Sequence, residues 1–257
     1  MSKATTSVDS VSGFIAWVKE NCSKRTWLFR GLDDDVSLLP STHRKPNPIE
    51  RDKEEHLFHK FKRQAVRMVD NPPQTDLDWI ALARHHGLPT RVLDWTADPI
   101  VALWFALSPG SGEPKDPRVR AFPIDDNDVI QIEAGQYIAL PSSENTNAIA
   151  QGQKSVLRDP FSGRGHAGRT LLFVPEPVSP RIVAQQGWLM LFATPKDALP
   201  TAFEKNDRYK DKIATVLIGR QQRDQINVEL RDRGIDRALL FPDLDNRCRA
   251  LGEQANL

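Results

Sequence analysis

The segment that most constrains the fold lies at residues 100–107, where every residue is apolar. Asp98 and Pro99 come directly before it, and these residue types favour the N-cap and the first position of a helix. A helix that is apolar on nearly every side has no face for solvent, so other elements must surround it. We therefore expect a helix over residues 100–107 deep in the core.

Apolar residues that recur at helical spacing indicate further helices. Residues 11–18 form a short amphipathic pattern after suitable capping residues at 9–10. Residues 49–69 give the clearest pattern, and residues 76–86 predict another helix, which ends at the glycine that follows. The single apolar face predicted over residues 49–69 contains Leu57, Phe58, Phe61, Ala65, Met68 and Val69.

Strands are indicated mainly in the second half of the chain. One early segment, residues 26–31, predicts a buried strand that ends at a glycine. The later candidates are residues 119–124, 170–174, 181–186, 188–193 and 213–218, with a short one at 238–241. Residues 221–233 return to a helical pattern that ends at a glycine. Helices gathered in the N-terminal half and strands gathered later favour an α+β fold over a βαβ repeat.

Length and composition favour a single globular domain. The chain has 257 residues, of which 39% are hydrophobic and 27% are charged, and this is typical of one domain over residues 1–257. The net charge of +1 excludes a protein that binds polyanions by bulk charge, although a local basic face stays open. Residues 135–168 are rich in small and polar residues, and they predict a long mobile loop inside this domain.

Cysteine usage and hydropathy favour a cytoplasmic protein. Cys22 and Cys248 lie far apart and fit no metal-type spacing, so we interpret them as unpaired thiols of a reducing compartment. Residues 1–10 lack the pattern of a signal peptide. No apolar run approaches the roughly 20 residues of a membrane span. We expect a cytoplasmic protein with no membrane partner.

The densest group of polar side chains lies at residues 85–96. Two imidazoles, a guanidinium, a carboxylate and two hydroxyls fall within this segment, beside the apolar helix. One interpretation is a structural network in which Asp94 pairs with Arg91 and Thr96 caps a turn, because a buried polar group without a partner costs roughly 1–3 kcal/mol. The other interpretation is that part of the segment faces a ligand.

Arg30 stands at the end of an apolar strand, directly before a glycine. The planar guanidinium of an arginine in such a place binds a carboxylate or a phosphate through two parallel hydrogen bonds. Its partner is either a ligand or an internal carboxylate, from residues 33–35 or from Asp94. Spacing alone does not choose between these alternatives.

These segments resemble the motifs of the FRG domain family. The resemblance runs over about residues 26–251, nearly the whole chain, and its long central motif is specific. The residues that carry it are Phe29, Arg30, Gly31, the run 85–96, Pro99, Ala102, Phe105, Ala106, Gln185, Gln186, Gly187 and the run 240–245. The family's name comes from its motif and implies no mechanism.

The order of the motifs is also similar, more distantly, to the Arg-Ser-Glu class of ADP-ribosyltransferases. That class begins with a strand that ends in an aromatic residue, Arg and Gly, as residues 29–31 do. It continues with a hydroxyl-bearing strand before a helix, where Thr96 stands. The resemblance implies a split-sheet core of ADP-ribosyltransferase type with NAD as substrate. The enzyme would transfer ADP-ribose to a protein or nucleic acid, with residues 135–168 recognising this acceptor, or would hydrolyse NAD.

The same resemblance implies roles for individual residues. Arg30 is expected to hold the phosphates, His86 and Thr96 to contact the riboses, and Asp94 or Gln186 to act at the reacting ribose. His86 is also expected to serve as a general base near neutral pH. The expected NAD-binding residues are Arg30, Gly31, His86, Thr90, Arg91 and Thr96. The expected catalytic residues are Asp94, Gln186 and His86.

One position departs from the pattern of the class. The class carries on its late strand a Glu that binds the ribose 2′-hydroxyl, whereas residues 181–187 offer Gln185 and Gln186. Glutamine can accept this hydrogen bond, but it has no negative charge to stabilise the cation that forms when the nicotinamide–ribose bond breaks. Asp94 or Asp243 can supply the charge instead.

Two other functions stay open. A metal-dependent nuclease or phosphoesterase would depend on a bound cation and would lose activity to a chelator. Its residues would be His85, His86, Asp94 and Asp243. A non-catalytic module would instead bind a nucleotide or a partner in the same pocket. The leading interpretation needs no metal site, and a role as a toxin or in antiviral defence would suit a compact enzyme that consumes NAD.

Overall fold

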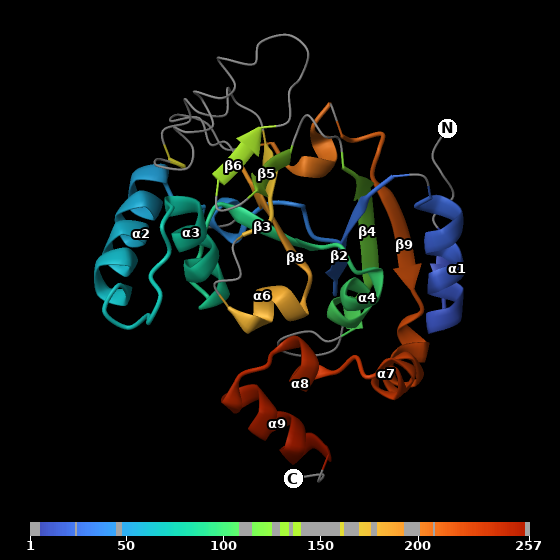
Figure 1. Ribbon diagram of the computed structural model, residues 1–257. Helices are drawn as coiled ribbons and strands as arrows, with labels where there is room; N and C mark the ends of the chain where they lie inside the picture. The colour runs from blue at the N-terminus through green and yellow to red at the C-terminus, as the bar shows by residue number, and fades with distance from the viewer. Residues whose placement is uncertain are drawn as a thin grey trace.

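The computed structural model has the α+β fold that the sequence predicts. It describes residues 6–23, 25–44, 48–107, 115–124, 129–133, 136–139, 160–161, 170–175, 179–192, 201–207 and 209–254. The described strands form one mixed sheet in the order β1-β9-β4-β2-β3-β8-β7-β5-β6 (Figure 1). They are β1 Thr6–Val8, β2 Trp27–Leu32, β3 Val92–Thr96, β4 Arg118–Pro123, β5 Val129–Glu133, β6 Gln136–Ala139, β7 Leu171–Phe173, β8 Gly187–Leu191 and β9 Ala214–Ile218.

The described helices precede, separate and follow these strands along the chain. They are α1 Val11–Asn21, α2 Arg51–Ala65, α3 Asp76–His85, α4 Pro99–Leu107, α6 Pro180–Ala184, α7 Arg223–Asp232, α8 Arg237–Leu240 and α9 Leu244–Gln254. Short 3₁₀ turns lie at Ser41–His43, Phe203–Lys205 and Arg220–Gln222.

The sheet consists of two arms that meet at one point. β2 pairs with β4 along its whole length, and β3 pairs with β8 along its whole length. Between β2 and β3, only Phe29 and Thr96 lie in register. The first arm therefore contains β1, β9, β4 and β2, and the second contains β3, β8, β7, β5 and β6. Whether this core is of the ADP-ribosyltransferase type stays a prediction.

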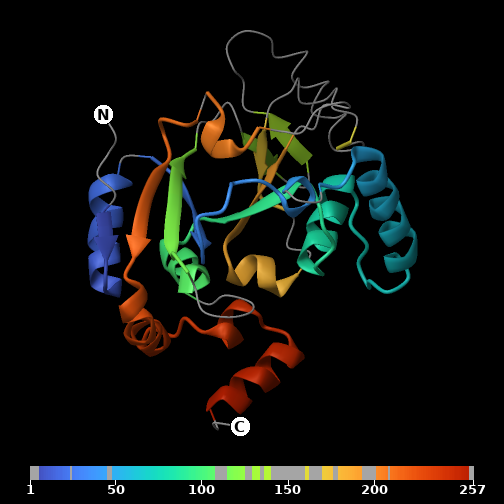
Figure 2. The ribbon, with the colours of Figure 1, turned by 180° about the vertical axis from the view of Figure 1, so that it is seen from behind.

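Each arm has its own helices. Apolar side chains of α1, α4 and α7 share a core with β4 and β9 of the first arm. α2 and α3 pack on the second arm, where Phe58 and Ile80 meet Phe173. Figure 2 shows α1 and the pair α2–α3 at opposite ends of the molecule. A third cluster, with Leu28 from the first arm and Trp95 from the second, spans both arms.

α4 lies deep in the core, as its sequence predicts. Asp98 caps it, because the Oδ1 atom of Asp98 accepts a hydrogen bond from the N–H of Ile100 at 2.8 Å. Its fully buried side chains are Ala102, Leu103, Ala106 and Leu107.

Gly31 is the point where α4 approaches β2. A β-carbon at Gly31 would lie 2.5 Å from the backbone nitrogen of Ala106 and closer still to the carbonyl oxygen of Ala102. Both atoms belong to the backbone of the helix and cannot move aside alone. The glycine of the Phe29-Arg30-Gly31 motif is therefore needed for packing, while the phenylalanine joins the two arms.

α2 is shorter than the sequence predicts. It ends at Ala65, and Met68, which we placed on its apolar face, has an exposed fraction of 82%. The chain reverses after Ala65 because the end of α2 is tied to the start of α3. Lys62 forms an ion pair with Asp76 at 2.5 Å. Val66 and Met68 are exposed after this turn, whereas Val69 is partly buried and still packs against the core that α2 and α3 share.

Two predicted strands are helices. Residues 181–186 fall largely in α6, because the Oγ atom of Ser179 accepts a hydrogen bond from the N–H of Ile182 and Pro180 occupies the first turn. Residues 238–241 fall largely in α8, where Asp236 is the N-cap and accepts from the N–H of Leu239 at 2.8 Å. In both segments a helix cap overrides the strand preference of the residues that follow.

The remaining differences concern placement along the chain. Helices α7 to α9 come late and strands β1 to β3 come early, so the two kinds of element are less segregated than expected. β6 lies inside the segment predicted as a loop, residues 135–168, where residues 160–161 form a turn and the rest lies outside the described residues.

The single-domain organisation stays a prediction. No disulfide links Cys22 and Cys248. Among the described helices, none has the length and apolar character that a membrane crossing needs.

We expect the Gly31→Ala variant to lose about 3 kcal/mol of unfolding free energy, because the new methyl group must displace the backbone of α4. Chemical denaturation measures this loss. The control is Gly252→Ala, since a β-carbon at Gly252 meets no atom within 4 Å, and it should change stability by less than about 1 kcal/mol. Equal stability of the two variants would show that α4 does not need this close approach.

Candidate functional site

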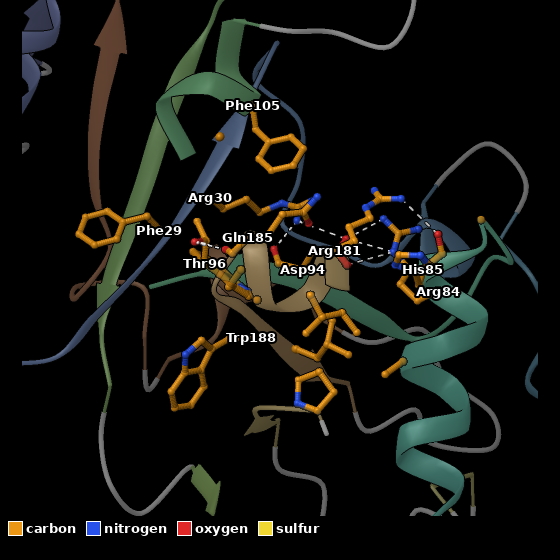
Figure 3. A pocket seen from close by; sticks show the side chains of 18 residues that line it. Phe29, Arg30, Arg84, His85, Asp94, Thr96, Phe105, Arg181, Gln185 and Trp188 are labelled. Atoms are coloured by element: carbon orange, nitrogen blue, oxygen red, sulfur yellow. Dashed lines mark hydrogen bonds and ion pairs between the residues drawn. The ribbon is translucent and has the colours of Figure 1, made fainter. Parts of the chain in front are cut away.

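A cleft of about 380 Å³ opens where the two arms of the sheet separate. Arg30 and Gly31 from β2 line it, together with Asp94 and Thr96 from β3 and His85 from the end of α3. Arg30 therefore shares one cavity with part of the polar run 85–96. Figure 3 shows the side chains of this cleft, with Arg30, Arg84 and Arg181 gathered around Asp94.

Arg30 fills the gap between the separating strands. Beyond the pair Phe29–Thr96, no backbone register joins β2 to β3. The Nη1 atom of Arg30 donates a hydrogen bond to the carbonyl oxygen of Asp94 and lies 3.8 Å from its Oδ2 atom. The Nε atom is buried and has no hydrogen-bond partner among the described residues. Burial lowers the pKa of Arg30 to about 10, against the opposing attraction of Asp94.

Asp94 is held as an anion by Arg84. The Nη2 and Nε atoms of Arg84 donate to Oδ2 at 2.7 and 3.0 Å, and Nε also lies 3.3 Å from Oδ1. Burial acts to raise the pKa of Asp94, but Arg84, Arg30 and Arg181 together lower it below the usual value. The same pair raises the pKa of Arg84. The Asp94 carboxylate is therefore ionised, and its side chain is still 44% exposed in the cleft.

Arg181 and His85 line the cleft in contact with each other. The Nη1 atom of Arg181 donates to the carbonyl oxygen of His85 at 3.3 Å, and the Nδ1 atom of His85 lies 3.2 Å from the Oγ atom of Ser179. Burial, with repulsion from Arg181 and His86, lowers the pKa of His85 to about 4, so this imidazole is neutral near pH 7. Three guanidinium groups and one carboxylate leave the cleft with a surplus of positive charge.

Aromatic side chains provide the apolar walls of the cleft. Phe105 comes from α4 and Trp188 comes from the start of β8, whereas the side chains of Phe29 and Trp95, two residues that also line the cleft, are buried in the core. Figure 3 shows Phe105 and Trp188 on different sides of the group around Asp94. Large flat rings beside guanidinium groups suit a ligand that carries both an anionic group and an aromatic ring.

The hydroxyl of Thr96 is engaged with the backbone. Its Oγ1 atom donates to the carbonyl oxygen of Gln185 at 2.7 Å and accepts from the N–H of Asp98 at 3.0 Å. Thr96 therefore caps a turn, as one of our two interpretations held, and it also lines the cleft. Its contact with Gln185 ties β3 to the end of α6.

Arg91 lies outside the cleft, and its predicted pair with Asp94 is wrong. Arg91 is fully buried, and its Nη2 atom lies 2.9 Å from the Oε2 atom of Glu54. Its guanidinium also lies 4.2 Å from the ring centroid of Phe161. The reason lies in the placement of the helices, because Arg91 precedes β3 and meets Glu54 of α2, whereas Asp94 lies farther along the strand and meets Arg84 of α3.

Three other expected residues do not line the cleft. His86 is the C-cap of α3, with its ring 4.8 Å from that of His85. Thr90 is buried, and its hydroxyl has no hydrogen-bond partner among the described residues. Gln186 is exposed in a turn with a φ of 44°, and its amide lies 3.3 Å from the Oδ2 atom of Asp98. Its predicted place on a late strand is wrong, and the neighbouring Gln185 lines the cleft instead.

The arrangement does not favour a cation-dependent site. Among the described residues, no group of three or more His, Cys, Asp or Glu side chains is placed to hold a metal ion. Asp94 lies among guanidinium groups, which repel a cation. Asp243 caps α9, because its Oδ1 atom accepts from the N–H of Asn246 at 2.9 Å. The carboxylates of the predicted nuclease thus have structural partners.

The main residues that sequence reasoning missed are Arg84 and Arg181. Arg84 lies in the last turn of α3, directly before the polar run, and the helical pattern around it is visible in the sequence. Arg181 was assigned to a strand, so its place beside Arg84 could not be found. The Ser179-Pro180 pair, which is a helix start signal, would have corrected this assignment.

The α+β fold of this chain opens at a cleft with several arginines around one ionised carboxylate, an arrangement whose charge attracts anions. Residues 25–114 match the family model of the FRG domain. Arg30, Arg84 and Asp94 lie inside this range, whereas Arg181 and Trp188 lie beyond it. No curated protein matches this chain, and no solved structure does.

We expect acid to destabilise the protein through His43, which is 3% exposed. Burial and the charge of Arg91 lower the pKa of His43 from 6.5 to about 4. The unfolded chain therefore binds more protons than the folded chain between these two values. The unfolding free energy should fall by about 3 kcal/mol from this group as the pH falls from 6.5 to 4.

Denaturation at several pH values, with His43→Gln as the comparison, measures this effect. Glu54, whose pKa burial raises against the attraction of Arg91, acts in the opposite direction in both proteins. The difference between the two curves therefore isolates His43. Parallel curves over this range would contradict the prediction.

Proposed function

We propose that the cleft binds NAD and that the domain breaks the bond between nicotinamide and ribose, with ADP-ribose passing to a macromolecule or to water. The observation that carries this proposal is the ionised carboxylate of Asp94 inside a cleft of surplus positive charge. This cleft offers an anion for a cationic sugar and cations for a pyrophosphate within one cavity.

The binding side of the proposal rests on arginines and aromatic rings. Guanidinium groups bind phosphate oxygens through parallel hydrogen bonds, and Arg30 has a buried Nε atom without a partner among the described residues. Phe105 and Trp188 offer flat surfaces on which a base can stack. The volume of about 380 Å³ is within the usual range for sites that take a small molecule, although it is near the lower end.

The chemical side of the proposal rests on Asp94. When the glycosidic bond of NAD breaks, its electron pair moves to the pyridinium nitrogen and nicotinamide leaves as a neutral molecule. The ribose carbon becomes an oxocarbenium ion, which the carboxylate of Asp94 stabilises. A nucleophile then adds to this carbon and loses its proton. Among the described residues that line the cleft, Asp94 is the only acidic one, so it takes the role for which Gln186 was the other candidate.

We expect Asp94→Asn to slow the release of nicotinamide from NAD by about 100-fold or more, because one preorganised charge at the cation is lost. The affinity for NAD should not fall, because the arginines that paired with the carboxylate can then bind the phosphates of NAD. Chromatography of released nicotinamide and calorimetric titration with NAD measure the two quantities. Undiminished release by the variant would contradict the role of Asp94.

A non-catalytic nucleotide-binding module is the second candidate. This candidate is favoured because the Asp94 carboxylate already has partners within the protein. Arg84 contacts both of its oxygens, and Arg30 lies close to one of them. Binding of NAD without any release of nicotinamide would favour this candidate. Three further proposals depend on this activity. The first is a macromolecular acceptor, and the second is a contribution of residues 135–168 to its recognition. The third is a role in the cytoplasm as a toxin or in antiviral defence.

A further inference from the structure

Arg181 differs from the other cleft arginines in its partners. Arg84 commits its Nε and Nη2 atoms to Asp94, and Arg30 donates to the carbonyl oxygen of the same residue. No carboxylate of the described part of the chain lies within ion-pair distance of Arg181. Its hydrogen bond goes to the carbonyl oxygen of His85, 3.3 Å from Nη1. In the described part of the chain, this cation of the cleft thus has no carboxylate at ion-pair distance, although Asp94 and Asp243 lie near enough to influence its charge.

The guanidinium of Arg181 is held by an aromatic ring. It lies 4.2 Å from the ring centroid of Phe241, which follows α8. Phe241 is itself packed, with its centroid 6.1 Å from that of Phe105 and 5.9 Å from that of Trp104. The C-terminal segment therefore reaches the cleft through this ring.

A second contact fixes the same part of the cleft. Gln185, at the end of α6, donates from its amide nitrogen to the carbonyl oxygen of Leu240 at 2.9 Å. Arg181 lies in α6 and Gln185 is the C-cap of the same helix, and both contact residues 240–241. This clamp limits the positions that the Arg181 guanidinium can take.

We propose that Arg181, positioned by Phe241, is the arginine that binds a phosphate group of the ligand directly. This inference rests on the proposed nucleotide-binding function and names the contact that the family motif does not include. A phosphate can bind Arg181 without breaking an ion pair, whereas Arg84 would have to leave Asp94. Burial, the largest influence, lowers the pKa of Arg181, but an arginine stays protonated in proteins, and a partly desolvated cation attracts an anion more strongly.

The direct test compares Arg181→Gln with Arg237→Gln by calorimetric titration. Arg237 also lies over Phe241, 5.8 Å from its centroid, but it does not line the cleft. We expect Arg181→Gln to weaken the binding of NAD, ADP and inorganic pyrophosphate by about 10- to 100-fold. Adenosine, which has no phosphate, should change by less than about threefold in this variant, and Arg237→Gln should leave all four affinities within about threefold.

Phe241 is tested as a positioning residue. Phe241→Leu removes the ring that holds the guanidinium, so it should weaken pyrophosphate binding by about tenfold while adenosine binding is retained. Phe241→Tyr keeps the ring and should restore the affinity to within about threefold of the original protein. A merely structural role would affect adenosine and pyrophosphate alike and would overturn the positioning role.

The outcomes separate the two proposals. Binding of NAD that Arg181→Gln leaves unchanged keeps the proposed function and overturns the role of Arg181. Binding of pyrophosphate or ADP but not NAD, with loss in Arg181→Gln, keeps the role of Arg181 and overturns the NAD function. No binding of any phosphate compound by the original protein overturns both.

Discussion

The contact between Arg30 and Asp94 is the interaction on which the cleft depends. It lies where β2 and β3 separate, one residue beyond their only register pair, Phe29 and Thr96. The side chain of Arg30 takes the place of a backbone hydrogen bond, so the strands can diverge without leaving the Asp94 carbonyl unpaired. Gly31 then lets α4 close over the same strand. Three consecutive residues thus join the arms, open the cleft and pack the central helix.

The electrostatics of the cleft follow from this geometry. Arg30 contacts Asp94 at the gap, and Arg84 in the last turn of α3 forms an ion pair with the Asp94 carboxylate. This pair keeps the carboxylate ionised. The third arginine, Arg181, belongs to α6, which precedes β8 of the second arm, and has no carboxylate within ion-pair distance among the described residues. The near-neutral chain therefore carries a local cationic cleft that its net charge of +1 does not reveal. We propose that an anionic ligand completes this arrangement of charges.

Sequence reasoning could predict the parts of the fold that local chemistry determines. The cap at Asp98, the buried helix after it and the strand that carries Arg30 follow from composition and spacing alone. The partner of Asp94 could not be predicted, because Arg91 is nearer to Asp94 along the chain than Arg84 is, and only the packing of α2 and α3 pairs Arg91 with Glu54 and Arg84 with Asp94. The place of Arg181 was lost because Ile182 and Val183 favour a strand, whereas the cap at Ser179 makes a helix.

A crystal structure of the protein with NAD tests the central claim most directly. We expect the pyrophosphate within hydrogen-bond distance of Arg181 and Arg30, the nicotinamide ribose beside Asp94, and an aromatic ring of the ligand against Phe105 or Trp188. NAD bound away from the gap between β2 and β3, with Asp94 and its arginines unchanged and facing only solvent, would contradict the claim.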